Sequence, residues 1–120
     1  QVLPVHSLAE IKRLVDFFPE NIKLFVAKKQ KKIMAGIVIY EDRHWLHTQY
    51  MANTPAGKSV GALDLIVDRL LVEYYPDKQI LDFGISNEKE GRFLNVGLIA
   101  QKESFGARAV VHDFYEWILT

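Results

Sequence analysis

The sequence predicts an α/β fold built on a mixed sheet, with the element order α-β-β-β-α-β-α-β. A capped amphipathic segment comes first, and three strand-like runs joined by short turns follow it. A long helical stretch then leads into a short apolar run. Short connections favour antiparallel neighbours, whereas a strand that follows a long helix can return parallel to an earlier strand. We therefore expect an antiparallel start and a single parallel crossover.

The first four elements are expected in the N-terminal half of the chain. Ser7 and Glu10 have the spacing of a capping box, which predicts a helix over residues 7–18 that ends at Pro19. Apolar residues then recur with the alternation typical of strands. The three predicted strands span residues 22–28, 33–40 and 43–52.

The C-terminal half continues with two helices and two strands. A helix is predicted over residues 58–75, and an apolar strand over 79–85 follows it. Asn87 and Glu90 have capping-box spacing, so a second helical region is expected from about residue 86 to 104. Alternation over residues 107–119 predicts a last strand.

The composition is that of an ordinary globular domain. The chain has 120 residues, of which 49% are apolar and 25% charged, which favours one domain and excludes disorder as its main state. Fifteen Lys and Arg balance fifteen Asp and Glu, so a uniformly basic nucleic-acid binder is not expected. We expect residues 1–120 to form a single domain within a longer chain, because the sequence starts at Gln1 and not at Met.

Cysteine usage narrows the chemistry and the compartment. The chain has no cysteine, which excludes disulfide scaffolds, cysteine nucleophiles and Cys-ligated zinc. No apolar run approaches the roughly 20 residues of a membrane span, and no secretory signal is visible. A cytoplasmic location is therefore expected.

Residues 52–59 imitate the phosphate-binding P-loop, which would indicate a nucleotide hydrolase. That pattern requires glycine at its first position, where this chain has Ala52. Pro55 also removes a backbone N–H from a loop that must donate such groups. A weaker possibility remains at this helix start, where Gly57, Lys58, Gly61 and Ala62 can favour a phosphate. The alternative is a plain helix start whose small residues allow close packing.

A few polar residues lie on predicted strands, where they are candidates for a site. His47 and Gln49 share one strand face and form either a buried hydrogen-bonded pair or the lining of a site. Asp82 lies near a strand end, where sheets of this kind bind ligands, or its carboxylate is satisfied by a neighbouring group. His44 and His47 face opposite sides of their strand, and no metal-ligand spacing exists elsewhere.

The element order and four short segments resemble the GCN5-related N-acetyltransferase (GNAT) superfamily. Within it, the chain most resembles the branch of the Fem-type aminoacyl transferases and related bacterial acetyltransferase-like domains. The most specific match is a lysine three residues before a Phe-Gly turn, here Lys102 before Phe105 and Gly106. The four segments are residues 58–62, 81–86, 95–98 and 102–107.

The resemblance implies an acyl- or aminoacyl-transferase that acts on an amine. The donor in this superfamily is a thioester of coenzyme A, such as acetyl-CoA, or aminoacyl-tRNA in the Fem-type branch. The acceptor is a small molecule or a cell-wall precursor. By resemblance, the donor lies along the third strand and its pyrophosphate on the following loop. The matching positions are Met51, Ala52, Gly57, Lys58, Gly61 and Ala62.

The resemblance also suggests which residues act on the substrate. The acceptor amine attacks a bound carbonyl that backbone N–H groups of the third strand polarise. His47 is the expected base, and Gln49, Asp82 and Lys102 are expected to contact substrate. The lysine that matches Lys102 is associated, in the Fem-type branch, with phosphates of a nucleotide-linked acceptor.

Two departures from the family pattern favour an alternative function. Counted from Lys58, the loop has Gly61 in place, but Leu63 stands where the family has glycine or alanine. The usual first strand and first helix, which shape the acceptor side, are missing or shortened. The alternative is a non-catalytic binding or dimerisation module with a degenerate donor site, paired with another copy or with an upstream domain.

Overall fold

The computed structural model describes residues 4–120, and their contacts divide the chain into two units. The first unit runs to Gly84, and the second is Ile85–Thr120. The division falls just after the predicted parallel strand. The expectation of one domain over the whole chain stays a prediction.

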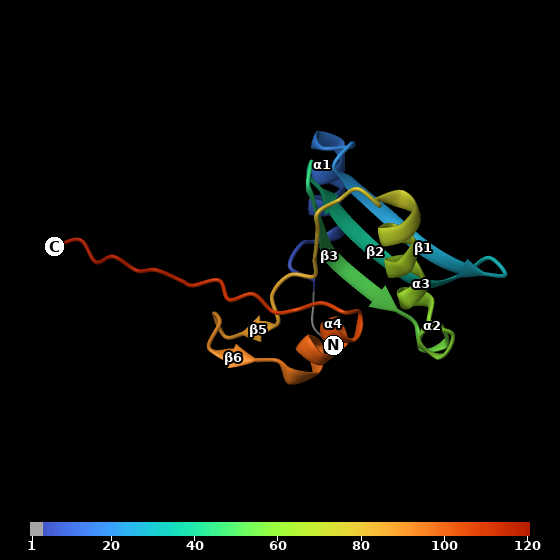
Figure 1. Cartoon of the computed structure of the whole chain (residues 1–120). Helices are drawn as coiled ribbons and strands as arrows, with labels where there is room; N and C mark the ends of the chain where they lie inside the picture. Colours follow the sequence, from blue (N-terminus) through green and yellow to red (C-terminus); the bar gives the residue numbers. More distant parts are fainter. Residues whose placement is uncertain (1–3) are drawn as a thin grey trace. The chain divides into compact units, whose positions relative to one another are not determined.

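The first unit contains a four-stranded mixed sheet in the order β1-β2-β3-β4. Strands β1, β2 and β3 lie side by side in Figure 1. Successive strands β1 (Ile22–Lys29), β2 (Lys32–Glu41) and β3 (Trp45–Asn53) pair antiparallel. The short strand β4 (Ile80–Asp82) pairs parallel to the start of β3. The mixed sheet with one parallel crossover is therefore confirmed.

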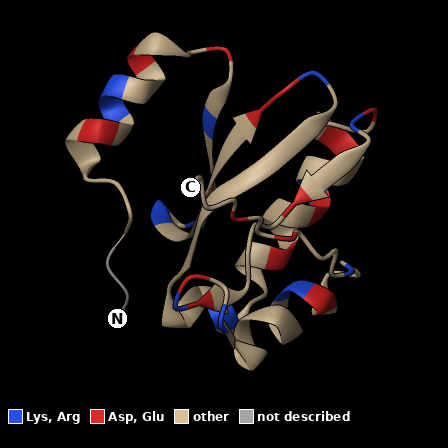
Figure 2. Ribbon diagram, turned by 90° about the vertical axis from the view of Figure 1, so that its left-hand side faces the viewer, with Lys and Arg blue, Asp and Glu red and all other residues tan. Residues whose placement is uncertain are grey.

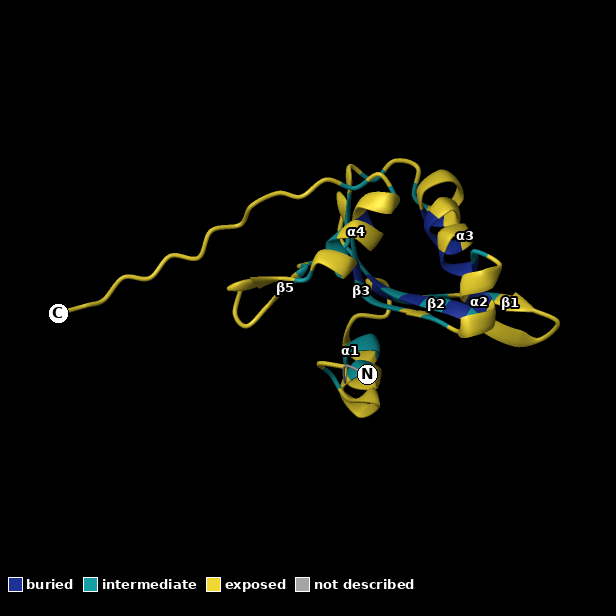
Figure 3. Cartoon of the chain, turned by 90° about the horizontal axis from the view of Figure 1, so that it is seen from below, coloured by how far each residue is buried: buried dark blue, intermediate teal, exposed yellow. Residues whose placement is uncertain are grey.

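Helix α1 (Leu8–Phe17) begins with the predicted capping box. Oγ of Ser7 accepts from the N–H of Glu10 at 3.3 Å, and Oε2 of Glu10 accepts from the N–H of Ser7 at 2.6 Å. The helix lies on the opposite face of the sheet from α3 (Figure 3). It carries both charge signs along its length (Figure 2) and has no buried residue.

The prediction of one continuous helix over residues 58–75 is wrong. The chain forms three shorter helical segments there. These are α2 (Pro55–Ser59), α3 (Ala62–Arg69) and the π-helical turn η1 (Leu70–Tyr74). Gly61 has a φ of +67°, a left-handed conformation that interrupts a right-handed helix and suits glycine best. The early turn of α2 and the main helix α3 therefore point in different directions.

The core of the first unit lies between α3 and one face of the sheet (Figure 3). Alternate residues of β2 point into it, and the buried side of α3 covers them. Thr48 of β3 is also buried there. The buried apolar side chains of this layer are Ala35, Ile37, Ile39, Leu46, Ala62, Leu63, Ile66, Val67 and Leu70.

The second unit begins with a hairpin, so the helix expected from residue 86 is wrong in its first half. Strands β5 (Asn87–Glu88) and β6 (Phe93–Leu94) pair antiparallel. The turn between them holds Lys89, Glu90 and Gly91 at positive φ, which a helix cannot accommodate. Helix α4 (Val96–Ser104) starts later, where Oδ1 of Asn95 accepts from the N–H of Leu98 at 2.9 Å.

The last strand, predicted over residues 107–119, is also wrong. Residues 107–120 form neither helix nor strand. Alternating side chains give a segment two faces, but a strand exists only where its backbone pairs with another strand. The resemblance requires this strand, so the detailed GNAT element order is not confirmed.

Candidate functional site

The point where β3 runs past the end of β4 is the site that the sequence singles out. β4 pairs with Trp45–His47 only, through Ile80, Leu81 and Asp82. β3 continues from there to Asn53, paired with β2 on its other side. His47 is the last β3 residue beside β4, so its side chain lies where the two parallel strands part.

His47 and Asp82 form a hydrogen-bonded pair between these strands. Nδ1 of His47 lies 2.9 Å from Oδ2 of Asp82. A carboxylate can only accept, so Nδ1 carries the hydrogen and donates it. The two side chains keep 34% and 42% of their surface exposed, which leaves them within reach of a ligand. This pairing joins two residues that the sequence proposed separately.

Gln49 completes the group on the other side of the imidazole ring. Its Oε1 lies 3.1 Å from Nε2 of His47, as their predicted common face implies. The protonated ring donates to this oxygen, whereas the neutral ring accepts from the amide NH₂ after the amide turns over. The β2–β3 register shifts between Val38 and Ile39, which leaves Gln49 as the extra residue of a bulge.

Asp82 is itself held in place by the loop that follows it. Its Oδ1 accepts from the N–H of Gly84 at 2.7 Å. Gly84 has a φ of +74°, and a Cβ added there would lie 3.2 Å from Cε1 of His47. The glycine thus lets the loop pass close to the imidazole while its N–H orients the carboxylate. Sequence reasoning missed Gly84, although the Asp-x-Gly spacing is typical of such a turn.

An open cavity of about 320 Å³ lies beside His47. Its lining combines two aromatic rings with two carboxylates: Tyr40, Glu41, Asp42, Trp45 and His47. Tyr40 is the cross-strand partner of His47, with ring centroids 6.2 Å apart. Burial raises the pKa of Tyr40, and its buried hydroxyl has no hydrogen-bond partner among the described residues. Sequence patterns do not single out Tyr40 or Trp45, because aromatic residues on strands most often belong to the core.

Glu41 links this cavity to a charged cluster on the other side of the strand. Its carboxylate lies 2.7 Å from Nζ of Lys23 and 3.1 Å from Nζ of Lys78, and it accepts from the hydroxyl of Tyr75 at 3.1 Å. Burial works to raise the pKa of Glu41, but the hydrogen bonds from these three groups hold it below its usual value. The Glu41 carboxylate is therefore occupied by these three partners. Of the two acids that line the cavity, Asp42 is the one more able to contact a ligand.

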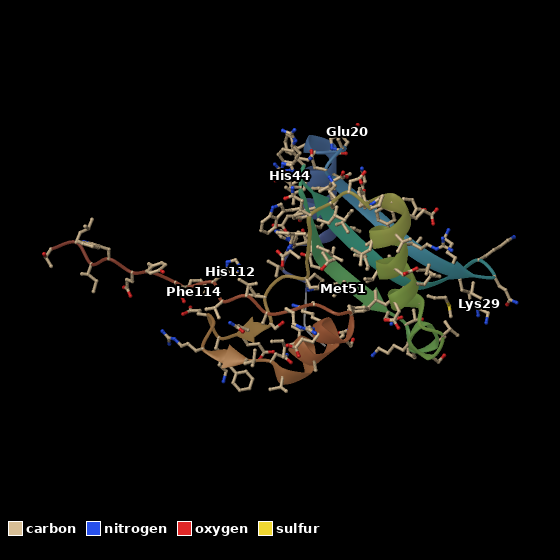
Figure 4. The ribbon with its side chains drawn as sticks, in the orientation of Figure 1. Glu20, Lys29, His44, Met51, His112 and Phe114 are labelled. Atoms are coloured by element: carbon tan, nitrogen blue, oxygen red, sulfur yellow. The ribbon has the colours of Figure 1, made fainter. Side chains whose placement is uncertain are left out.

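The predicted donor positions lie on β3 and on the turn after it. Met51 (Figure 4) and Ala52 pair with Ile37 and Gly36 of β2. The N–H of Gly57 donates to Oγ1 of Thr54 at 2.9 Å. A Cβ at Gly57 would overlap the carbonyl oxygen of Met34, so this face of the glycine packs on the sheet.

The remaining loop positions also fit a pyrophosphate poorly. The N–H of Lys58 donates to the carbonyl oxygen of Thr54 at 2.9 Å, and that of Gly61 to the carbonyl oxygen of Lys58 at 3.4 Å. Oδ2 of Asp64 would lie 3.6 Å from a Cβ at Gly61, which brings a negative charge to this turn. Ala62 is buried in the core. The loop therefore does not fit the pyrophosphate of coenzyme A.

Lys102 lies in the second unit, on the last turns of α4. Its side chain is buried, and Nζ donates to the carbonyl oxygen of Ile85 at 2.6 Å. This bond joins the helix to the start of the same unit. The structure thus groups His47, Gln49 and Asp82, and it assigns Lys102 to a separate unit.

The part of the chain from residue 4 onward holds no cluster of three or more His, Asp or Glu side chains that could bind a metal ion. His44 precedes β3, and His112 lies in the irregular C-terminal segment (Figure 4). In the same part of the chain, none of the helices has both the length and the apolar character that crossing a bilayer requires.

Comparison with known proteins does not assign the chain to a family. No family model matches it, and no curated protein matches it.

Proposed function

We propose that the first unit is the core of a GNAT-like acyl- or aminoacyl-transferase that moves an acyl group onto an amine. The observation that carries the proposal is the position of the His47–Asp82 pair where β3 and β4 part. Beyond this point, β3 offers backbone groups that are not paired with β4. A proton acceptor and a row of backbone donors therefore lie next to each other.

Each part of this arrangement has a role in acyl transfer. Along β3, alternate N–H groups point away from β2, and they can bind the oxygen of a donor carbonyl as negative charge develops on it. Nδ1–H of His47 is held by Asp82, so Nε2 is the nitrogen that takes the proton from the attacking amine. The imidazolium then gives this proton to the sulfur or oxygen of the donor as its bond to the acyl carbon breaks, so the donor leaves as a thiol or an alcohol. Gln49 contacts Nε2 until the acceptor arrives.

The cavity beside His47 suits an amine acceptor. The rings of Tyr40 and Trp45 can stack on or face an ammonium group, which aromatic faces attract. The carboxylate of Asp42 adds attraction for a positive charge. An acceptor bound there would approach the imidazole from the cavity and lose its proton before attack.

The donor is either a thioester of coenzyme A or aminoacyl-tRNA. The occupied N–H groups of Gly57 and Lys58, and the carboxylate of Asp64, weigh against pyrophosphate binding at this loop. They favour the aminoacyl ester, whose transferred carbonyl needs only the β3 edge and the base.

The proposal is tested by transfer from both donors to a panel of primary amines. We expect transfer by the whole protein to fall by about 10²-fold in H47Q, because a positioned base contributes at least that much. H44Q, which changes a histidine just outside β3, is the matched control and should retain activity. Equal turnover by H47Q and the unchanged protein would overturn the role of His47.

Thermal unfolding with acetyl-CoA separates the two donors. A ligand at 100 times its Kd stabilises the native state by about 2.7 kcal/mol. We expect no such stabilisation with acetyl-CoA, and a shift with a non-hydrolysable aminoacyl-tRNA analogue. A shift with acetyl-CoA alone would reverse this choice of donor.

The second candidate function is a non-catalytic GNAT-like binding or dimerisation module. It is favoured by the internal bonding of the residue 54–61 loop, which leaves the donor site degenerate. This function predicts no transfer with either donor and no change in partner binding for H47Q.

A further inference from the structure

The C-terminal segment of the second unit exposes nearly all of its large apolar side chains. Their exposed fractions run from 75% to 91% for Val110, Val111, Phe114, Tyr115, Trp117, Ile118 and Leu119. The ring of Phe114 would lie 3.3 Å from a Cβ at Gly91, yet most of it remains in solvent. Soluble proteins rarely leave such a continuous apolar stretch uncovered, so this segment needs a binding surface.

The order of its residues indicates what kind of surface that is. In an extended segment, successive side chains point to opposite faces. Val110, Phe114 and Ile118 then share one face, whereas Tyr115 and Trp117 share the other. A segment that is apolar on both faces suits a strand that is covered on both sides, not one that lies flat on a surface.

β1 is the sheet edge that matches such a strand. It forms one edge of the sheet over eight residues, whereas β4 at the opposite edge has three. Leu24 and Val26 lie on one face of β1 and remain 66% and 39% exposed. Phe25 lies on the other face, against the ring of Tyr74 at a centroid distance of 5.0 Å. An added strand would therefore meet apolar side chains on both faces.

A hollow beside β1 adds a specific place for a large side chain. It has a volume of about 120 Å³ and lies between β1 and α3. Its lining is mostly apolar, with one arginine and one tyrosine: Phe25, Val26, Ala27, Leu65, Ile66, Arg69 and Tyr74. A bulky residue of an added strand, such as Phe114 or Trp117, could fill it.

The charges of the two surfaces are complementary. Lys28 and Lys29 end β1 and give this edge positive charge. Edge lysines discourage indiscriminate strand pairing, because a partner must bring negative charge to compensate them. Asp113 and Glu116 lie within the exposed segment and can supply that charge.

We propose that residues 110–119 of one copy of this chain pair with β1 of a second copy as an added strand. β1 and β4 are opposite edges of the sheet, and the second unit follows β4 in the chain. A second copy can present its segment to β1 without crossing the sheet. The exchange is reciprocal, so the assembly closes as a twofold dimer in which both segments are covered.

The first test is the mass of the chain in solution, measured by light scattering during size exclusion. The full chain is expected at twice its 13.8 kDa, and a chain that ends at Ala109 at the monomer mass. The double variant L24K/V26K should also be monomeric, because it places charge on the receiving edge. V60K changes an exposed apolar residue between α2 and α3, outside β1, and should remain a dimer.

The second test asks whether the segment binds its own chain or another copy. The chain has no cysteine, so single cysteines report one pair of positions at a time. A K28C chain is mixed in turn with V111C, D113C and Y115C chains and oxidised. Cross-linked pairs of unlike chains are expected from the mixtures.

Three results would overturn the proposal. The full chain could be a monomer at every concentration, or its dimer could persist in L24K/V26K. The third is a K28C/Y115C double variant that forms its disulfide within a single chain, while the mixtures of single-cysteine variants give no disulfide between two different chains. That result would place the segment on its own β1. The readouts do not involve acyl transfer, so they stand apart from the proposed function.

Discussion

Nδ1 of His47 lies 2.9 Å from Oδ2 of Asp82, and this hydrogen bond joins two strands across 35 positions of sequence. The same carboxylate accepts from the N–H of Gly84 through its other oxygen. Asp82 is therefore fixed by its own loop before it orients the imidazole. An arrangement in which one group positions another is typical of a base whose tautomer matters for its chemistry.

Replacing Asp82 with asparagine should free the tautomer of His47. An amide can present either its oxygen or its NH₂ to Nδ1, so the ring is no longer forced to donate there. In D82N we expect the ¹⁵N resonances of the imidazole to shift from the Nδ1–H form toward a mixture of tautomers. If the chain is a transferase, D82N should also lower kcat by about 10-fold to 100-fold.

The control for this variant is D77N, which removes a carboxylate from the loop before β4. It should leave the ¹⁵N spectrum of His47 unchanged. A D82N spectrum identical to that of the unchanged protein would mean that Asp82 does not set the tautomer.

Gly84 should tolerate no side chain, for two separable reasons. G84A forces a residue with a Cβ into the left-handed region, which costs about 1–2 kcal/mol, and it brings that Cβ to 3.2 Å from Cε1 of His47. G61A is the matched control, since Gly61 has a similar φ but only Oδ2 of Asp64 within 4 Å. Urea unfolding should show a larger loss for G84A than for G61A, and the His47 resonances should move only in G84A. Equal losses with no change at His47 would exclude the imidazole contact.

Gly57 should be the least replaceable glycine of the first unit. A Cβ at this position would overlap the carbonyl oxygen of Met34 and Oδ1 of Asn53, and would lie 2.9 Å from the Met34 carbonyl carbon. Two of these atoms belong to the backbone of β2, so no rotamer change relieves the overlap, and we expect G57A to cost about 3 kcal/mol or more.

G36A provides the comparison for G57A. Its Cβ would make ordinary contacts of 3.5 Å and longer with β1, so its unfolding midpoint in urea should stay close to that of the unchanged protein. If G57A were equally well tolerated, α2 could not pack against β2 as closely as the structure has it.

Local sequence patterns predicted the elements whose partners lie nearby in the chain. The Ser7–Glu10 capping box and the three-strand meander depend on short-range spacing, and both are present. His47 and Gln49 were paired from strand alternation alone, and their side chains are 3.1 Å apart. Such patterns depend on residues that are close in the sequence, so the local sequence is enough to predict these elements.

The wrong predictions concern segments whose structure depends on distant strand partners or on unusual backbone conformations. Capping-box spacing at Asn87 and Glu90 predicted a helix, but positive φ values from Lys89 to Gly91 turn the chain into a hairpin. Alternation over residues 107–119 predicted a strand, but alternation does not provide the partner that a strand requires. The pairing of His47 with Asp82 was equally beyond local reasoning, because it depends on the register of a parallel crossover.

Glu41 should make the first unit sensitive to acid. Hydrogen bonds from Lys23, Lys78 and Tyr75 outweigh its burial and hold its pKa below the usual 4.5. A carboxyl group whose pKa is lowered by folding stabilises the native state above its unfolded pKa, and this contribution is lost as pH falls through the folded pKa. At pH 7, E41Q should lose about 2 kcal/mol of unfolding free energy, because two lysines lose a charged hydrogen-bond partner.

The pH dependence separates this effect from a simple loss of packing. The difference between E41Q and the unchanged protein in urea unfolding should be constant above pH 5. It should shrink as pH falls below about 4.5, because Glu41 of the unfolded chain binds a proton there, and it should be lost once the folded carboxylate is protonated as well. E73Q removes an exposed carboxylate that lies 2.6 Å from Arg69 one helical turn away, and should cost only about 0.3–0.5 kcal/mol. A loss in E41Q that stayed the same from pH 7 to pH 3 would show that shape, and not the charge of Glu41, holds β1, β2 and the end of η1 together.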